Sequence, residues 1–428
     1  MKSLKFITLA DIFEQLEKTT SGNKMREILA NFFKKVPKNE IDIVSYLLLG
    51  QIASKYEDIN IGMAEKMVLR SIAIDSGKSE KEVKNTFKKL GDVGLTAEKL
   101  TTKTKPTLLV SKVFKTLHQI ASASGPGSQE VKINTLANLL KKASPKEAKY
   151  IARIVLGTLR LGAGDMTLLD ALSIAFTGTK ENKPKLEHAY NICPDIGVIA
   201  KTIAAKGLKG IEKINVVVGR PIQMMLAQRA KSVQMIKEKI PGTIACEEKY
   251  DGERIQAHFN GKRIVLFSRR LENITQQFPD VVDGLKKSIK AKTYVVEGEV
   301  VPIDEKGNLL PFQILMQRRR KYEVERYVKK IPVCLFLFDL LYLNGKNYIH
   351  KPYPERHAAL QKIVKPTKTI KLANRTLCKE IDCIEDFFNW CISHGAEGII
   401  AKSCAPDSTY KAGVRGWLWI KWKQEYQK

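Results

Sequence analysis

Apolar residues in the first half of the chain recur every three or four positions, and lysines fill many of the positions between them. The stretches NKMREILANFFKKV and KINTLANLLKKASPKEAKYIARIVLG show the pattern most clearly. This spacing places the apolar side chains on one face of a helix, where they can pack into a core. We therefore predict an all-α domain over residues 1–208.

The helical half also contains a repeat. Short matching segments occur twice in the same order, which indicates an internal duplication; chance similarity between amphipathic helices is the alternative. The matching segments are Leu29-Ala30-Asn31 with Lys34-Lys35 and Leu136-Ala137-Asn138 with Lys141-Lys142, Gly50 and Gly157, and Ser71–Ala73 and Ser173–Ala175.

Between Gly207 and Pro221 the helical spacing breaks down, and a different pattern follows. Short runs of alternating or β-branched residues are then separated by turn residues, as in strands and hairpins. Strands are predicted at 243–250, 254–259, 263–268, 293–303 and 333–343, and helices at 277–289, 354–363 and 384–394. This mixture predicts an α+β domain built on antiparallel sheet over residues 209–428.

Composition indicates a partner. The chain has 73 lysines and arginines against 45 acidic residues, a formal net charge of +28. Such an excess favours a polyanion, because cations near phosphates release counterions; a generally solvated basic surface is the alternative. Apolar runs stay shorter than the ~20 residues of a membrane span. Seven cysteines without a C-x-x-C pair indicate a reducing compartment and argue against a zinc site.

The stretch CEEKYDGERIQAHF combines a predicted strand with charged residues at its end. Lys249 ends the strand, and Asp251-Gly252 favours a tight turn directly after it. A side chain at such a position is held by the sheet and can still reach a cleft. A surface lysine before a hairpin is the alternative interpretation.

Paired acidic residues and a basic strand lie further along the chain. Glu297 and Glu299 are two apart in a predicted strand, so both carboxylates share one face. There they repel each other unless a cation or a sugar hydroxyl lies between them; the solvent face of a strand is the alternative. In EGIIAK, Glu397 and Lys402 bracket a short apolar strand.

Alternation in GWLWIKWKQEY places Trp419, Lys421 and Lys423 on one strand face. Cations beside aromatic rings suit a phosphate chain, and snorkelling lysines on an edge strand are the alternative. In VCLFLFDLLYLNGK, Phe338 lies in an apolar run, for which core packing is the default interpretation.

Six of these motifs occur in a fixed order: K-Y-D-G-E-R, S-R-R-L-E, E-G-E, F-D-L, E-G-I-I-A-K and W-I-K-W-K. The series resembles the ATP-dependent DNA ligases, in particular the archaeal and eukaryotic replicative type. The stretch LRLGAGDMTLLDALSIAF, which includes Arg160, is similar to that family's N-terminal DNA-binding domain. The resemblance covers nearly the whole chain.

The resemblance implies a reaction through a lysyl–AMP phosphoramidate, in which ATP adenylates the enzyme, AMP passes to the 5′-phosphate of a nick, and the 3′-hydroxyl displaces it. Lys249 is the implied nucleophile, and its amine must be deprotonated to attack. The implied nucleotide contacts are Glu247 at the adenine edge, Arg254 and Glu299 at the ribose, Phe338 stacked on the base, and Arg269, Lys402, Lys421 and Lys423 at the phosphates. Mg²⁺ would bind Glu397 with Glu297 and Glu299, and DNA would contact Lys34, Lys35, Lys141, Lys142 and Arg160.

The implied partner is nicked double-stranded DNA, bound by a monomer in the cytoplasm of an archaeal-type cell, close to the nucleoid; the residues themselves identify no sliding clamp. The resembled family continues past the last lysine motif into a small OB-type barrel, so two of three expected domains lie within the 428 residues. An RNA ligase or a capping guanylyltransferase shares K-x-D-G but needs no helical domain of this kind. A non-catalytic nucleic-acid-binding relative is the remaining alternative.

Overall fold

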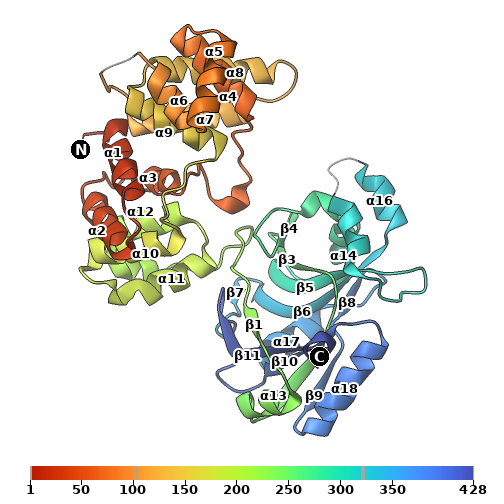
Figure 1. Ribbon diagram of the computed structural model, residues 1–428. Helices are drawn as coiled ribbons and strands as arrows, with labels where there is room; N and C mark the ends of the chain where they lie inside the picture. Colours follow the sequence, from red (N-terminus) through yellow and green to blue (C-terminus); the bar gives the residue numbers. More distant parts are fainter. Residues whose placement is uncertain (1, 103–104, 320–322, 428) are drawn as a thin grey trace. The chain divides into compact units, whose positions relative to one another are not determined.

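The computed structural model describes residues 2–102, 105–319 and 323–427 and divides the chain into two units (Figure 1). The helical unit comprises residues 1–190 and 194–214, and the sheet unit comprises residues 191–193 and 215–428. The predicted boundary after residue 208 falls inside helix α12 (Ile196–Glu212), which continues past a kink at Gly207. Of the described helices, none has the length and apolar character of a membrane span.

The helical unit confirms the predicted all-α domain. Helix α9 (Pro145–Leu156) illustrates how local sequence sets an element's bounds. Ser144 and Glu147 cap its first turn reciprocally, Pro145 occupies the first helical position, and Gly157 ends it at φ 77°. The remaining helices are α1 (Phe6–Glu17), α2 (Gly22–Phe33), α3 (Ile41–Leu48), α4 (Glu65–Ser76), α5 (Glu80–Leu90), α6 (Val93–Leu100), α7 (Val110–Ser122), α8 (Ser128–Lys141), α10 (Asp165–Thr177) and α11 (Lys183–Ile192).

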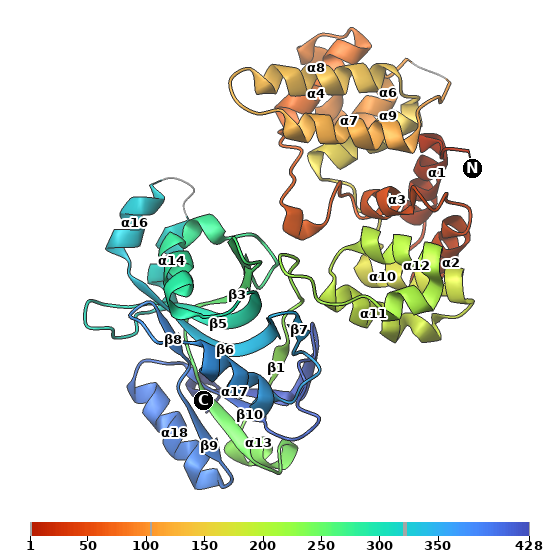
Figure 2. The same cartoon turned by 180° about the vertical axis from the view of Figure 1, so that it is seen from behind.

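Packing in the helical unit follows the sequence duplication, with an exchange between the copies. The matched segments place α2 opposite α8 and α4 opposite α10, so α1–α6 and α7–α12 are the two copies. Helix α2 packs on α10 while α8 packs on α4, and α3 packs on α12 while α9 packs on α6. Each lobe therefore combines half of one copy with half of the other: α1–α3 lie with α10–α12, and α4–α6 with α7–α9 (Figures 1 and 2).

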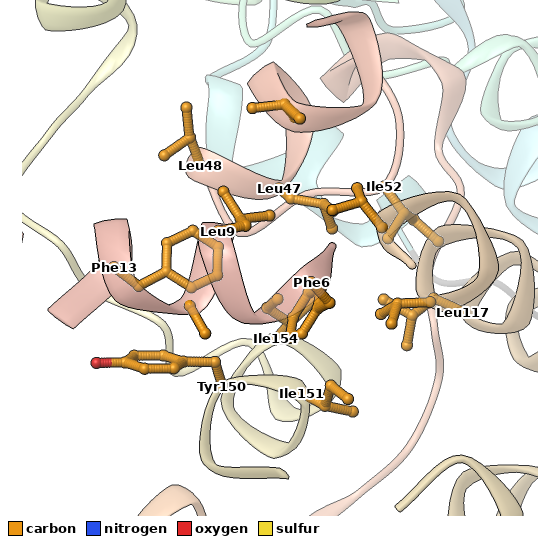
Figure 3. Packing of buried hydrophobic residues seen from close by; sticks show 14 of the residues in the cluster. Phe6, Leu9, Phe13, Leu47, Leu48, Ile52, Leu117, Tyr150, Ile151 and Ile154 are labelled. Carbon is orange, nitrogen blue, oxygen red and sulfur yellow. The ribbon is translucent and has the colours of Figure 1, made fainter. Parts of the chain in front are cut away.

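The hydrophobic core of the helical unit joins the two lobes. Helix α1 packs on α9, and its counterpart α7 packs on α3. Figure 3 shows Phe6 and Phe13 of α1 facing Tyr150 and Ile154 of α9, with Leu117 of α7 nearby. All five side chains are buried, and the rings of Phe13 and Tyr150 lie 5.2 Å apart. Burial of side chains of this size stabilises the fold by about 1.5–3 kcal/mol each.

The sheet unit contains two sheets and confirms the predicted α+β domain. The 5-stranded sheet has the order β1-β11-β10-β2-β9, and the 6-stranded sheet has the order β4-β3-β5-β6-β7, with β8 also paired to β6. Pairing is antiparallel except for β1 with β11 and β6 with β8. The strands are β1 (Leu226–Arg229), β2 (Ile244–Lys249), β3 (Glu253–Phe259), β4 (Ile264–Ser268), β5 (Tyr294–Pro302), β6 (Val333–Leu343), β7 (Lys346–Asn347), β8 (Ile370–Leu372), β9 (Arg375–Cys378), β10 (Gly398–Ser403) and β11 (Arg415–Lys423).

Helices cover one face of each sheet. Helices α13 and α18 pack against the 5-stranded sheet, and α14 and α17 pack against the 6-stranded sheet. The other faces are thereby left to line a cavity. The helices of this unit are α13 (Val233–Lys239), α14 (Pro279–Ser288), α15 (Phe312–Leu315), α16 (Val324–Lys330), α17 (Tyr353–Ile363) and α18 (Ile381–Ser393).

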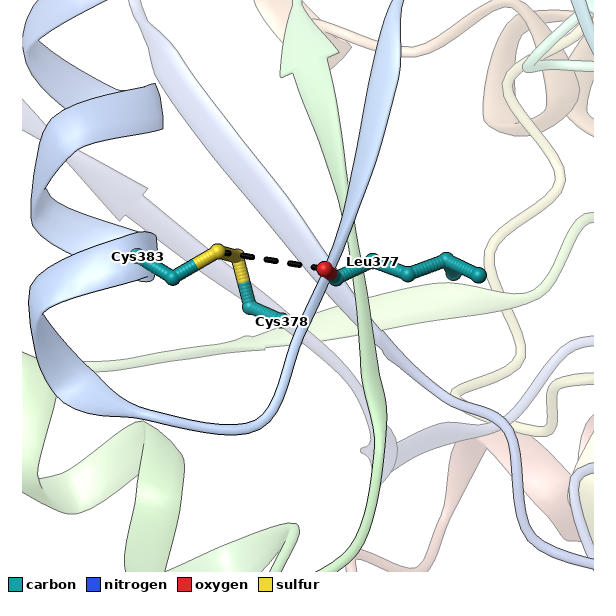
Figure 4. The surroundings of a disulfide bond; sticks show 3 residues. All are labelled: Leu377, Cys378 and Cys383. Atoms are coloured by element: carbon teal, nitrogen blue, oxygen red, sulfur yellow. Dashed lines mark hydrogen bonds between the residues drawn. A yellow bond between two sulfur atoms is a disulfide. The ribbon is translucent and has the colours of Figure 1, made fainter.

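A disulfide joins the end of β9 to the first turn of α18. Cys378 and Cys383 are bonded, with Cα atoms 5.6 Å apart, and the sulfur of Cys383 lies 3.8 Å from the carbonyl oxygen of Leu377 (Figure 4). The absence of a C-x-x-C pair suggested a reducing compartment, but a short strand-to-helix connection brings these two cysteines close enough to bond. The cysteine pattern therefore does not establish the compartment. Cys246 and Cys391 are buried thiols.

Candidate active site

A cavity of about 700 Å³ lies in the sheet unit, lined by residues of both sheets. Strands β2, β10 and β11 contribute from one sheet and β3, β5 and β6 from the other. The cavity therefore brings together side chains that are far apart in the sequence. The predicted site residues that line it are Glu247, Lys249, Arg254, Arg269, Glu299, Phe338, Glu397, Lys402, Lys421 and Lys423.

Lys249 ends β2 at the cavity wall, next to a turn that only glycine can form. A Cβ on Gly252 would lie 2.0 Å from the carbonyl oxygen of Val300, so the chain passes directly against β5. The Lys249 ammonium forms an ion pair with Glu397, whose Oε2 is also 3.3 Å from Lys423 Nζ. Burial opposes ionisation of Glu397, but Lys249 and Lys423 outweigh it and lower the pKa of this carboxyl.

Glu247 lies two residues before Lys249 on the same strand face and is almost fully buried. Its Oε1 is 2.8 Å from Lys402 Nζ, and its Oε2 accepts a hydrogen bond from the Tyr353 hydroxyl. The Lys402 ammonium lies 4.4 Å from the ring centre of Phe338 and 4.1 Å from that of Trp419. Lys402 also lines the cavity, and its predicted phosphate contact stays a prediction, because its ammonium is buried beside the Glu247 carboxylate.

Arg254 reaches from β3 towards the same aromatic pair. Its Nη1 donates to the carbonyl oxygen of Met225 at 2.6 Å, and its Nη2 lies 3.3 Å from the Glu297 carboxylate. Glu297 is fully buried, also accepts a hydrogen bond from Tyr410, and is not among the cavity-lining residues. Both hydrogen bonds, from Arg254 and from Tyr410, go to Oε1, whereas Oε2 accepts none, so the predicted binding of Mg²⁺ by Glu297 stays a prediction that its burial outside the cavity does not favour.

Glu299, two residues further along β5, does line the cavity. Burial raises the pKa of Glu299 to about 7, although Lys249 and Arg254 act in the opposite direction. The two carboxylates differ in their surroundings. Glu297 accepts hydrogen bonds from Arg254 and Tyr410, whereas Glu299 lines the cavity.

A cluster of cations lines the cavity around Lys249. It includes Arg269, Lys421 and Lys423, which the sequence predicts, and Arg415, which it does not. Burial, together with the charges of Arg415 and Lys249, lowers the pKa of Lys421. Like charges held this close repel one another, so the cluster favours binding of an anion.

Comparisons with known proteins agree with this geometry. Residues 224–423 match the family described as "ATP dependent DNA ligase domain", and residues 5–173 match "DNA ligase N terminus". The chain is 47% identical over 430 residues to "DNA ligase 1" of Methanosarcina acetivorans, covering 99% of this chain and 74% of that protein. It is 46% identical over 439 residues to "DNA ligase 2" of Thermofilum pendens, covering 99% and 73%.

The chain belongs to the ATP-dependent DNA ligases. A solved structure titled "Pmar-Lig_Pre." has the same fold at a TM-score of 0.56 and 15% identity, and the match covers 97% of this chain and 77% of that one. Enzymes of this family join nicked DNA at the expense of ATP.

The predicted DNA-binding residues of the ligase all lie in the helical unit. In the repeat, Lys34 corresponds to Lys141 and Lys35 to Lys142, and the positions directly after α2 and α8 are Lys34 and Lys142. Both are exposed, as are their neighbours Lys35 and Lys141 and the more distant Arg160. None of them is among the residues of the cavity.

Several functional candidates of the ligase escaped the sequence analysis. Arg415 continues the alternation of Trp419 and Lys421 towards the start of β11, so that pattern could have identified it. Tyr353 and Tyr410 contact the site carboxylates from outside its motifs, and no local pattern identifies them. Across the described residues, no group of three or more histidine, cysteine or acidic side chains is arranged to hold a metal ion.

Proposed function

We propose that Lys249 is the residue that becomes adenylated and that the ligase then transfers AMP to a 5′-phosphate in nicked duplex DNA. The position of Lys249 supports this most directly, because it lines the same cavity as Glu247 and Phe338 and as the cations Arg269, Lys421 and Lys423. The Nζ–P bond would form at the α-phosphate while the bond from that phosphorus to pyrophosphate breaks. Pyrophosphate would leave past Arg269, Lys421 and Lys423.

The base end of the cavity is suited to adenine. Glu247 offers an acceptor for the 6-amino group, and the adjacent Lys402 offers a donor for N1, while Phe338 provides an aromatic face. Guanine presents the reverse order, an acceptor at position 6 and a donor at N1. This polarity supports ATP as the nucleotide and weighs against a capping-type guanylyltransferase.

Activation of Lys249 requires loss of its proton and release from Glu397. An arriving nucleotide would supply phosphates to Lys421 and Lys423 and so loosen the present pairing of Glu397. In this scheme Glu397 holds Lys249 in place until the substrate binds.

Mg²⁺ is expected with the nucleotide rather than in a cage built by the protein. This ion prefers one or two carboxylates together with substrate phosphates and water. Glu299 and Glu397 are the cavity carboxylates that would hold it. When bound, Mg²⁺ would neutralise charge on the phosphates.

The helical unit would bind the DNA backbone, with one lysine pair from each copy and Arg160 as contacts. Phosphate contacts position a protein on DNA without reading sequence. We further propose that the ligase acts as a monomer in the cytoplasm of an archaeal-type cell, which its similarity to Methanosarcina and Thermofilum proteins supports.

Incubation with labelled ATP or GTP and Mg²⁺, followed by recovery of protein-bound label, tests the assignment. Label from ATP on the wild-type chain, and none on Lys249→Ala, is expected. Label from GTP alone would indicate capping chemistry. Unchanged labelling of the variant would remove Lys249 from its role. Pre-adenylated nicked DNA tests the sealing step separately, and a non-catalytic relative would fail in both assays.

A further inference from the structure

Among the described residues, Tyr353 and Lys402 are the ones whose side chains form a hydrogen bond or an ion pair with the Glu247 carboxylate. Tyr353 begins α17 and is buried, and it does not line the cavity. Its hydroxyl therefore reaches Glu247 from a residue that lies outside the cavity lining. The two carboxylate oxygens are held separately, one by Lys402 and the other by Tyr353.

The direction of the hydrogen bond follows from a third residue. Arg375 of β9 lies opposite Glu247 in the strand register, and its Nη1 donates to the Tyr353 oxygen at 3.2 Å. Because that oxygen already accepts from a guanidinium, the hydroxyl proton is directed at Glu247. Burial and the adjacent Glu247 raise the pKa of Tyr353, so the hydroxyl remains a donor.

Helix α17 fixes the position of the Tyr353 side chain. The backbone N–H of Tyr353 donates to Ser408, and Arg356, three residues later, forms a buried ion pair with Asp339 at 2.8 Å. Asp339 directly follows Phe338 in β6. The first turn of α17 thus connects Glu247, through Tyr353, to β6, through Arg356. Strand β6 also carries Phe338.

We propose that Tyr353 is a positioning residue that sets the selectivity of the ligase for a 6-amino purine. By donating to Oε2, it fixes the plane of the Glu247 carboxylate and leaves both oxygens with only acceptor capacity towards the cavity. A purine with a donor at position 6 then gains a hydrogen bond to Glu247. A purine with an acceptor at position 6 is disfavoured, because it faces the acceptor oxygens of Glu247. This inference rests on the proposed function, in which the base lies beside Glu247.

Replacement of Tyr353 by phenylalanine removes the donor without removing the ring. The carboxylate can then rotate, and Arg375 loses its partner at the hydroxyl. Selectivity should fall even though the ribose and phosphate contacts are unchanged. Arg375→Met, which removes the group that orients the hydroxyl proton, should have the same effect to a smaller extent.

The test compares nucleotides that differ only at the base, with affinities measured by titration calorimetry on the whole chain. The probes are ATP, purine riboside triphosphate, which lacks the 6-amino group, and GTP. Wild type should bind ATP about tenfold more tightly than purine riboside triphosphate, the amount expected for a hydrogen bond to a charged acceptor. In Tyr353→Phe this ratio should approach one and discrimination against GTP should shrink, while the affinity for purine riboside triphosphate stays within about twofold.

Tyr294→Phe is the matched control. Tyr294 is a buried tyrosine of β5 whose hydroxyl has no hydrogen-bond partner, and it lies outside the cavity. This variant should keep the wild-type ratio. A full ATP preference in Tyr353→Phe would overturn the role of Tyr353 while leaving the proposed function intact. Failure of the wild-type chain to bind ATP would overturn both.

Discussion

Arg356 and Asp339 form a fully buried, two-pronged ion pair between α17 and β6, with N–O distances of 2.8 and 3.1 Å. Arg356 also donates to the carbonyl oxygens of Lys351 and Ser408. The guanidinium therefore holds together a strand and two loops behind the nucleotide cavity. A buried charge without its partner is costly, which makes this pair a test of what stabilises the sheet unit.

Arg356→Ala should lower the free energy of unfolding by about 3–5 kcal/mol, because the Asp339 carboxylate is left buried and unpaired. Denaturant unfolding followed by tryptophan fluorescence measures the change in the sheet unit. Arg326→Ala is the control, since Arg326 pairs with Glu323 on the surface and its side chain is 70% exposed. That variant should change the free energy by less than about 1 kcal/mol. Equal effects of the two substitutions would contradict the importance of the buried pair.

Glu299 should make the stability of the ligase depend on pH in an unusual direction. Its pKa is raised to about 7 from 4.5, so the folded state binds a proton that the unfolded state releases between these values. Stability from this group is present at low pH and is lost as the pH rises through about 7. In Glu299→Gln, the free energy of unfolding should fall less between pH 5 and pH 8 than it does in wild type. Parallel pH profiles of the two proteins would show that Glu299 titrates normally.

Both copies of the duplicated helical unit should contribute to DNA binding. Replacing Lys34 and Lys35 by glutamate, or Lys141 and Lys142 by glutamate, should weaken binding to nicked duplex by comparable factors. Each pair of changes should also flatten the dependence of affinity on salt, because fewer counterions are released. Anisotropy titrations at several salt concentrations measure both quantities.

The exposed pair Lys88 and Lys89, at the end of α5, is the matched control for this experiment. Charge reversal there alters the net charge equally, so any loss of affinity measures the general electrostatic effect. The variants of Lys34-Lys35 and of Lys141-Lys142 should each lose clearly more DNA affinity than this control. If only one of them does, the duplication maintains the fold without a second DNA contact.

The Cys378–Cys383 disulfide closes a short loop, so its contribution should be small. The chain-entropy relation gives about 2 kcal/mol for a loop of roughly five residues. Cys383→Ser should lose this amount, and a reducing agent should bring wild type to the same midpoint of unfolding. Cys404→Ser, which leaves the disulfide intact, should remain sensitive to the reducing agent. Insensitivity of the wild-type chain would mean that the bond contributes nothing.

Local patterns predicted several elements of the sheet unit closely. The expected strand at 333–343 is β6 (Val333–Leu343), and the expected strand at 254–259 is β3 (Glu253–Phe259). Turn residues and alternation set these bounds, and both act over a few residues. The exchange of helices between the two copies was not predicted, because contacts such as those of α2 with α10 depend on residues far apart in the sequence.

The site residues that belong to sequence motifs could be predicted. The partners that tertiary packing brings to them could not. Lys249, Glu247 and Lys423 stand in recognisable stretches, and all line the cavity. The environments of Glu297 and Lys402 were not predictable, because their partners Tyr410 and Glu247 come from other strands and loops. Alternation along a strand tells which face a side chain occupies, but it does not tell whether that face is already filled.

The exchanged packing of the helical unit has a consequence for how the chain matures. The lobe that contains α1–α3 is incomplete until α10–α12 have left the ribosome, and the lobe that contains α4–α6 is incomplete until α7–α9 have done so. A nascent chain therefore presents the apolar faces of α1–α3 for the time needed to translate most of the unit, when chaperones or premature association compete for them. A fragment that ends between α6 and α7 has no partner for either half, so a single copy on its own should not form a stable monomer.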